Sequence, residues 1–122
     1  MKKILIIDDE QAIRSMLKKL FEKYNYEVLE ASNGNQGVAL FKEHKPDLII
    51  TDLVMPEKEG LETIREIREL DQNVKIIAMS GGGIANANSY LQVAKKFGAQ
   101  YSFDKPLKLE ELLAAVKSLL DD

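Results

Sequence analysis

The chain has 122 residues, 45% of them hydrophobic and 30% charged, which is the size and composition of one folded domain with its own core. Its 17 basic and 20 acidic residues give a net charge of −3, which argues against a protein that binds the phosphate backbone of nucleic acids. Cysteine is absent, which excludes disulfides, zinc fingers and thiol nucleophiles. The apolar runs are too short to span a membrane and no signal peptide is recognisable, so we expect a cytoplasmic protein.

Two hydrophobic periods alternate along the chain and predict its secondary structure. Short solid apolar runs are typical of buried strands, whereas apolar residues spaced three and four apart are typical of helices. In chain order, the patterns predict a strand over 4–7, a helix over 13–24, a strand over 28–31, a helix over 35–44, a strand over 48–50, a helix over 60–71, a strand over 74–79, a helix over 88–97, a strand over 101–103 and a helix over 109–120. This alternation predicts an α/β fold with a single doubly wound, five-stranded parallel sheet of the flavodoxin-like (βα)5 type.

The composition of the strands predicts where each lies in the sheet. The strands over 4–7, 48–50 and 74–79 are almost entirely apolar and belong in the interior, whereas the other two mix polar with apolar residues and belong at the edges. The simplest order is then 2-1-3-4-5, which opens a crevice at the carboxyl ends of strands one and three. Gly37 inside a predicted helix costs about 1 kcal/mol relative to alanine and indicates close packing of that helix on the sheet.

Polar residues stand at the carboxyl ends of the predicted strands. Asp8 and Asp9 follow the first strand, Asp52 the third, Ser80 the fourth and Lys105 the fifth. Taken singly, each has a structural explanation as a helix cap, a turn or a solvated charge, but their joint placement at one edge favours a site. Converging carboxylates repel one another unless a cation lies among them, and oxygen ligands suit Mg²⁺. Lys105 can pair with Asp52, and both Lys105 and Ser80 can contact a phosphoryl group placed on that aspartate.

These residues and their spacing closely resemble the receiver domain of bacterial response regulators, the CheY-like family, over essentially all of residues 1–122. The motifs that carry the resemblance are Asp8-Asp9-Glu10, the segment from Pro46 to Pro56 around Asp52, then Gly60, Ser80 and Lys105-Pro106. The order 2-1-3-4-5 is itself typical of this family, so that expectation is not independent of the resemblance.

The resemblance implies a phosphoacceptor of two-component signal transduction rather than an enzyme. Asp52 would take a phosphoryl group from the phosphohistidine of a sensor histidine kinase or a phosphotransfer protein, with Ser80 and Lys105 contacting that group. A downstream protein would then bind the face formed by the fourth helix, the fifth strand and the fifth helix, with no direct binding of nucleic acid or membrane. The resemblance also implies a cis peptide bond between Lys105 and Pro106.

The resemblance further implies the metal ligands. Asp9, Asp52 and the carbonyl of Val54 would bind Mg²⁺ directly, and Asp8 would act through water. The residues at the positions of Val54 and Gly82 would flank the path of the water that hydrolyses the acyl phosphate. Val54 offers only methyl groups and Gly82 has no side chain, so neither can hold a water molecule. We therefore expect slow self-dephosphorylation.

Three residues depart from the family pattern. Ser102 stands where an aromatic residue is usual, and Tyr101 beside it points to the opposite face of the strand. Lys58 replaces a residue that is often apolar, and Gly37 replaces the usual alanine. None of these lies in the acidic pocket, so we expect phosphorylation to be preserved.

Other classes of protein fit the sequence less well. A phosphohydrolase with an aspartyl nucleophile would place two acids one residue apart, whereas Asp8 and Asp9 are adjacent. A flavin carrier would need a phosphate cradle where these acids stand. A receiver-like interaction module that is never phosphorylated is a further alternative, although such modules are expected to lack one of the acids or the lysine. The sequence leaves open whether the domain acts alone or is one module of a longer regulator.

Overall fold

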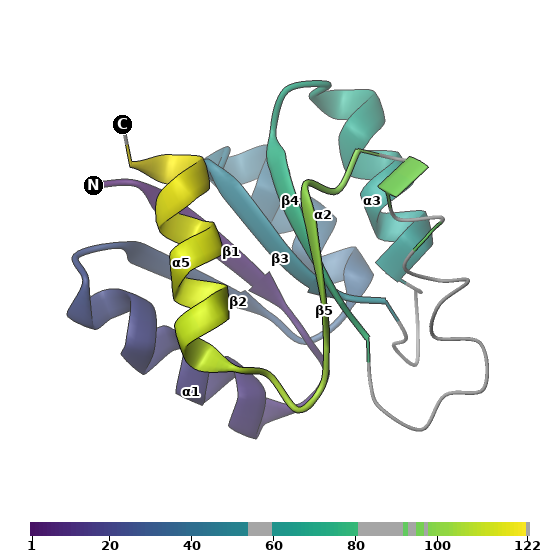
Figure 1. The fold of residues 1–122 in the computed structure, drawn as a ribbon. Helices are drawn as coiled ribbons and strands as arrows, with labels where there is room; N and C mark the ends of the chain where they lie inside the picture. The colour runs from purple at the N-terminus through teal and green to yellow at the C-terminus, as the bar shows by residue number, and fades with distance from the viewer. Residues whose placement is uncertain (54–59, 81–91, 93–94, 97, 122) are drawn as a thin grey trace.

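The structure is a computed structural model that describes residues 1–53, 60–80, 92, 95–96 and 98–121. Strands and helices alternate along the chain (Figure 1). The elements are β1 (Lys3–Ile7), α1 (Gln11–Lys23), β2 (Glu27–Ala31), α2 (Gly34–His44), β3 (Leu48–Asp52), α3 (Gly60–Leu70), β4 (Lys75–Ser80), β5 (Tyr101–Asp104) and α5 (Leu109–Leu120).

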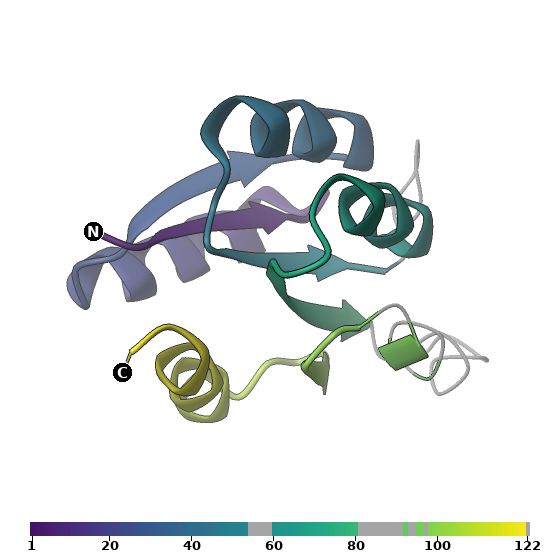
Figure 2. The same cartoon turned by 90° about the horizontal axis from the view of Figure 1, so that it is seen from above.

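The strands form one parallel, five-stranded sheet in the order β2-β1-β3-β4-β5, which confirms the predicted order and the predicted edge strands. Helices cover both faces of the sheet, with α2 and α3 on one face and α1 and α5 on the other (Figure 2). The predicted count of five helices is not reached among the described residues, which contain four. The helix predicted over 88–97 falls largely outside the described part of the chain.

Side chains of β1, β3 and β4 alternate between two hydrophobic cores, as expected for strands that are covered on both sides. The core under α2 and α3 contains Leu5, Ile7, Ile49, Ile64, Ile67 and Ile76, among others. The core under α1 and α5 contains Ile4, Ile6, Leu17, Phe21, Ile50 and Val116, among others. Because both cores clamp the interior strands, the carboxyl ends of these strands are held in fixed positions at one edge of the sheet.

None of the helices in the described residues has the length and apolar character needed to cross a membrane.

Gly37 packs directly against the sheet, as its position in the predicted helix indicated. A Cβ atom added to Gly37 would lie 2.9 Å from Cγ1 of Ile7 and would overlap its Cδ1. Ile7 is fully buried at the end of β1, immediately before Asp8. Gly37 therefore lets α2 approach the strand that carries the acidic pair.

We predict that Gly37→Ala lowers the free energy of unfolding by about 1 kcal/mol, because the overlap with Ile7 outweighs the better helix propensity of alanine. In an Ile7→Val background the Cδ1 atom is gone, and the same substitution should cost less. Urea denaturation of the two single variants and the double variant measures this coupling. An equal cost of Gly37→Ala in both backgrounds would contradict the packing explanation.

Candidate functional site

Carboxylates from two neighbouring strands meet at the carboxyl edge of the sheet. Asp8 and Asp9 follow β1 and Asp52 ends β3, and each offers an oxygen within 4.8 Å of the others. Asp8 is fully buried, Asp52 is 4% exposed, and Asp9 is exposed. The three acidic residues that the sequence predicted as metal ligands thus come together, while Val54 lies outside the described residues.

The ammonium of Lys105 lies among these acids. Its Nζ atom is 2.8 Å from Asp8 Oδ2, 3.2 Å from Asp52 Oδ2 and 3.2 Å from Glu10 Oε1. The expected pair between Lys105 and Asp52 is therefore present, with two further partners. The peptide bond between Lys105 and Pro106 is cis, which confirms the expectation from the resemblance.

Burial and ion pairing set the charges of this cluster. Burial raises the pKa of the Asp8 carboxyl, and the hydrogen bonds that it accepts from Lys105 and from the Glu10 backbone offset this only in part. Burial by itself would lower the pKa of Lys105, but the hydrogen bond to Asp8 and the charge of Asp52 outweigh it and raise the pKa. Lys105 is therefore a permanent cation in the physiological range.

Two residues to which the sequence analysis gave no role in the site, Glu10 and Arg14, help to position Asp8. The backbone N–H of Glu10 donates to Asp8 Oδ1 over 2.9 Å, and Arg14 Nη1 donates to the Asp8 carbonyl over 2.7 Å. Arg14 also approaches Glu30 of β2, with Nε 3.4 Å from Oε1. The sequence contains only a weak signal for these roles, namely that both residues follow the acidic pair at the start of the next helix.

The end of β3 is held by two backbone hydrogen bonds at Leu53, the residue after Asp52. The N–H of Leu53 donates to the carbonyl of Met79 over 2.9 Å, and the N–H of Gly60 donates to the carbonyl of Leu53 over 2.8 Å. A Cβ atom on Gly60 would overlap the Asp52 carbonyl oxygen and lie 2.9 Å from its carbonyl carbon. Glycine is required here because α3 begins directly against the backbone of the phosphoacceptor candidate.

Ser80 stands at the end of β4, one residue beyond Met79, which pairs with Asp52 in the sheet. Its side chain is fully buried, yet its Oγ has no hydrogen-bond partner among the described residues. A buried hydroxyl without a partner costs free energy unless another group supplies the bond. The Ser80 carbonyl accepts a 2.7 Å bond from the Lys105 N–H, which joins the two sides of the site.

These donors fit a hard divalent cation, because each ligand atom is a carboxylate oxygen and no softer nitrogen or sulfur ligand lies in the cluster. The Ser80 hydroxyl, which has no partner among the described residues, and the Lys105 ammonium then supply hydrogen-bond donors at the same edge of the sheet. Such an arrangement suits a carboxylate that carries an anionic group next to a cation.

We predict that Ser80→Ala does not lower the free energy of unfolding of the unmodified protein by more than about 0.5 kcal/mol, because the hydroxyl makes no hydrogen bond within the described residues. Thr51→Val is the matched control, since the buried Thr51 hydroxyl donates to the Asp52 carbonyl over 3.0 Å. This control should cost about 1 kcal/mol. Urea denaturation compares the two, and a loss with Ser80→Ala as large as the loss with Thr51→Val would contradict the assignment of Ser80.

Comparison with known proteins decides the family. Residues 4–117 match the family described as the response regulator receiver domain. The chain belongs to this family. Receiver domains are phosphoacceptors of two-component signal transduction, so the family match favours this reading over the phosphohydrolase and the flavin carrier.

Several relatives of this receiver domain match it over nearly their whole length. Sporulation initiation phosphotransferase F of Bacillus subtilis is 34% identical over 118 residues, covering 97% of this chain and 93% of the relative. Chemotaxis protein CheY of Thermotoga maritima is 38% identical over 119 residues, covering 97% of each chain. Among solved structures, the response regulator TrrA of Thermotoga maritima in complex with Mg²⁺-BeF has a TM-score of 0.86 at 34% identity, covering 98% of this chain and 100% of that one.

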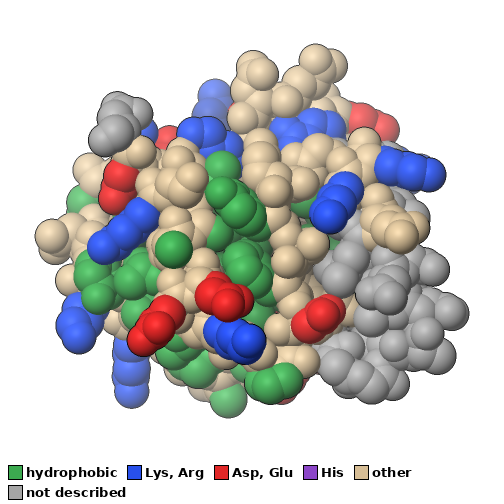
Figure 3. Space-filling model, in the orientation of Figure 1, with side chains coloured by type: hydrophobic (Ala, Val, Ile, Leu, Met, Phe, Trp, Pro, Cys, Tyr) green, Lys and Arg blue, Asp and Glu red, His purple; other side chains and the backbone are tan. Residues whose placement is uncertain are grey.

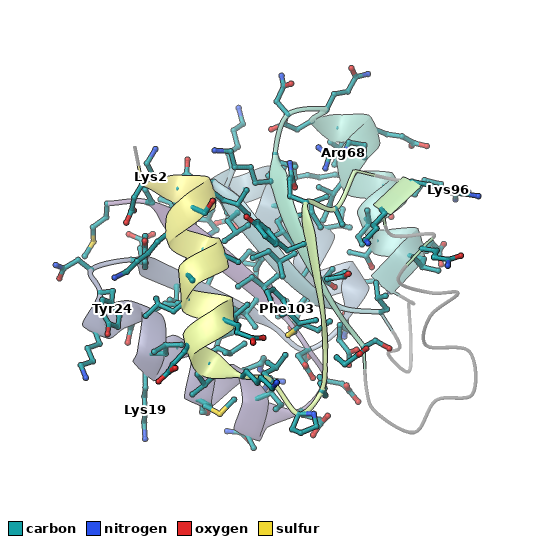
Figure 4. The ribbon with its side chains drawn as sticks, viewed as in Figure 1. Lys2, Lys19, Tyr24, Arg68, Lys96 and Phe103 are labelled. Carbon is teal, nitrogen blue, oxygen red and sulfur yellow. The ribbon has the colours of Figure 1, made fainter. Side chains whose placement is uncertain are left out.

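In β5, Ser102 stands where the family usually has an aromatic residue, as the sequence indicated. Ser102 pairs with Ala78 and thus shares a face of the sheet with Ser80, two residues further along β4. Tyr101 stacks on Phe103 with ring centroids 6.3 Å apart, on the α5 side. Figure 4 shows Phe103 between β5 and α5. In this receiver domain the aromatic side chains of β5 therefore point away from the Ser80 face.

Proposed function

We propose that Asp52 is the phosphoacceptor of this receiver domain and that the phosphoryl group comes from a phosphohistidine of a sensor histidine kinase or a phosphotransfer protein. The observation that carries this proposal is the environment of the Asp52 carboxylate. It is nearly buried, lies 3.2 Å from the Lys105 ammonium, and belongs to the acidic cluster with Asp8 and Asp9.

In the proposed reaction, an Asp52 carboxylate oxygen attacks the phosphorus and forms an acyl phosphate. The bond between phosphorus and the histidine nitrogen breaks, and its electron pair stays on that nitrogen. Lys105 gives up its pair with Asp52 and donates to a phosphoryl oxygen, and the Ser80 hydroxyl donates to another. Phosphoryl transfer requires mainly such positioning and charge neutralisation, and the surrounding strands already hold these groups in place.

Asp9, Asp52 and the carbonyl of Val54 would hold Mg²⁺, with Asp8 acting through water. When bound, the ion would neutralise charge on the phosphoryl oxygens. The Mg²⁺-BeF complex of TrrA supports this choice of metal. The acidic cluster of this chain supports it independently.

The proposed output is a change in protein binding at the face of the fourth helix, β5 and α5. The described part of this face has a hollow lined by Tyr101, Phe103, Ala114 and Ala115. Hydrophobic side chains are visible between α5 and β5 in Figure 3. In this proposal residues 1–122 form one receiver domain that acts in the cytoplasm on a protein rather than on nucleic acid or a membrane.

The chain would also phosphorylate itself from small phosphodonors and lose the group slowly. Slow loss follows from Val54 and Gly82, which offer no side chain that can orient the attacking water. Both residues lie outside the described part of the chain, so this proposal rests on the sequence.

We predict that Asp52→Asn abolishes uptake of a phosphoryl group from acetyl phosphate and Mg²⁺, because the amide cannot act as the nucleophile. Asp104→Asn is the control, since Asp104 ends β5 at the same edge of the sheet but is exposed and outside the acidic cluster. Intact mass spectrometry should show the added phosphoryl group on the unaltered protein and on the control. Labelling of the Asp52→Asn variant would contradict the assignment, and no labelling of the unaltered protein would favour the interaction module that is never phosphorylated.

A further inference from the structure

Glu10 differs from the other two acids that bind Lys105. Lys105 Nζ pairs with Asp8, Asp52 and Glu10, but only Asp8 and Asp52 belong to the cluster that can hold a metal ion. The Glu10 side chain is 59% exposed, whereas Asp8 and Asp52 are buried. Glu10 therefore lies at the rim of the site and contacts the lysine from outside the metal cluster.

The position of Glu10 in the fold gives its side chain no other use in the described residues. It stands at the N-cap of α1, but its side chain makes no capping hydrogen bond. Glutamate is also not among the residues that N-cap positions prefer. Its backbone N–H is fixed on Asp8 Oδ1, so the residue is anchored while its carboxylate reaches Lys105.

A divalent cation and Lys105 compete for the same carboxylates. Asp52 would bind the divalent cation directly and Asp8 would bind it through water, so both cations use the same two carboxylates, and two positive charges a few ångströms apart repel strongly in a site this buried. We therefore expect Lys105 to give up these two pairs when a divalent cation enters. The Lys105 side chain is only 11% exposed, so its ammonium then needs another carboxylate, because water cannot fully replace the lost partners.

We propose that Glu10 is a positioning residue that holds the Lys105 ammonium at the rim once Asp8 and Asp52 are given up to the metal, and that it thereby raises the affinity for Mg²⁺. This inference rests on the proposed function only in its choice of metal. Without the metal Lys105 has three partners, so losing Glu10 leaves two. With the metal bound, Glu10 is the one of these three acids that still pairs with Lys105. Losing Glu10 therefore destabilises the metal-bound protein more than the metal-free protein. The effect of Glu10 on the metal therefore acts through Lys105.

The test is the dissociation constant of Mg²⁺, measured by isothermal titration calorimetry on the unphosphorylated protein. The variants are Glu10→Gln, Lys105→Met and the double variant. Glu22→Gln, which removes an equal charge from an exposed position on α1, is the control for net charge. We expect Glu10→Gln to weaken Mg²⁺ binding about fivefold, the size expected of one partly exposed ion pair. In the Lys105→Met background the same change should have less than about a twofold effect.

Two results would overturn this inference. An equal loss of affinity from Glu10→Gln in both backgrounds would show that Glu10 acts on the metal directly, and a loss no greater than that of Glu22→Gln would show that only net charge matters. Glu10→Asp, which keeps the charge on a shorter side chain, should restore part of the affinity. Urea denaturation of each variant confirms that it is folded. Because no phosphoryl group is involved, the outcome is separate from the labelling of Asp52.

Discussion

The ion pairs of Lys105 are the interaction on which the acidic edge of the sheet depends. The parallel topology places Asp8 and Asp52 side by side at the ends of β1 and β3, where burial would otherwise leave two carboxylates facing each other. The Lys105 ammonium compensates this charge at 2.8 and 3.2 Å. A buried charge without a partner costs several kcal/mol, so the fold can keep its acidic site only with a cation in it.

The same lysine links the acidic site to the face proposed for output. Its side chain contacts the acids, while its backbone N–H donates to the carbonyl of Ser80 at the end of β4. Lys105 directly follows β5, and β5 carries Tyr101 and Phe103 toward α5. A phosphoryl group that draws Lys105 and Ser80 toward Asp52 would therefore act on the end of β5. The backbone after Asp52 is held by the hydrogen bonds of Leu53 and by the close approach of Gly60.

The fold was predictable from the sequence because hydrophobic patterns report burial directly. Solid apolar runs distinguished the interior strands from the edges, and the order of strands then placed the carboxylates and Lys105 at one edge. Side-chain alternation also predicted that Tyr101 and Ser102 point to opposite faces. The roles of Glu10 and Arg14 were missed, since both depend on the directions of long side chains that no periodic pattern records. The close approach of Gly60 to Asp52 likewise depends on the backbone path after β3.

The most direct test of this account is the stability of Lys105→Met, measured by urea denaturation with EDTA and again with Mg²⁺. In EDTA we expect the free energy of unfolding to fall by roughly 3 kcal/mol, because the buried acids lose their counterion. Saturating Mg²⁺ should stabilise this variant more than it stabilises the unaltered protein, since the metal then supplies the missing cation. An unchanged stability in EDTA, or equal stabilisation of both proteins by Mg²⁺, would contradict the account.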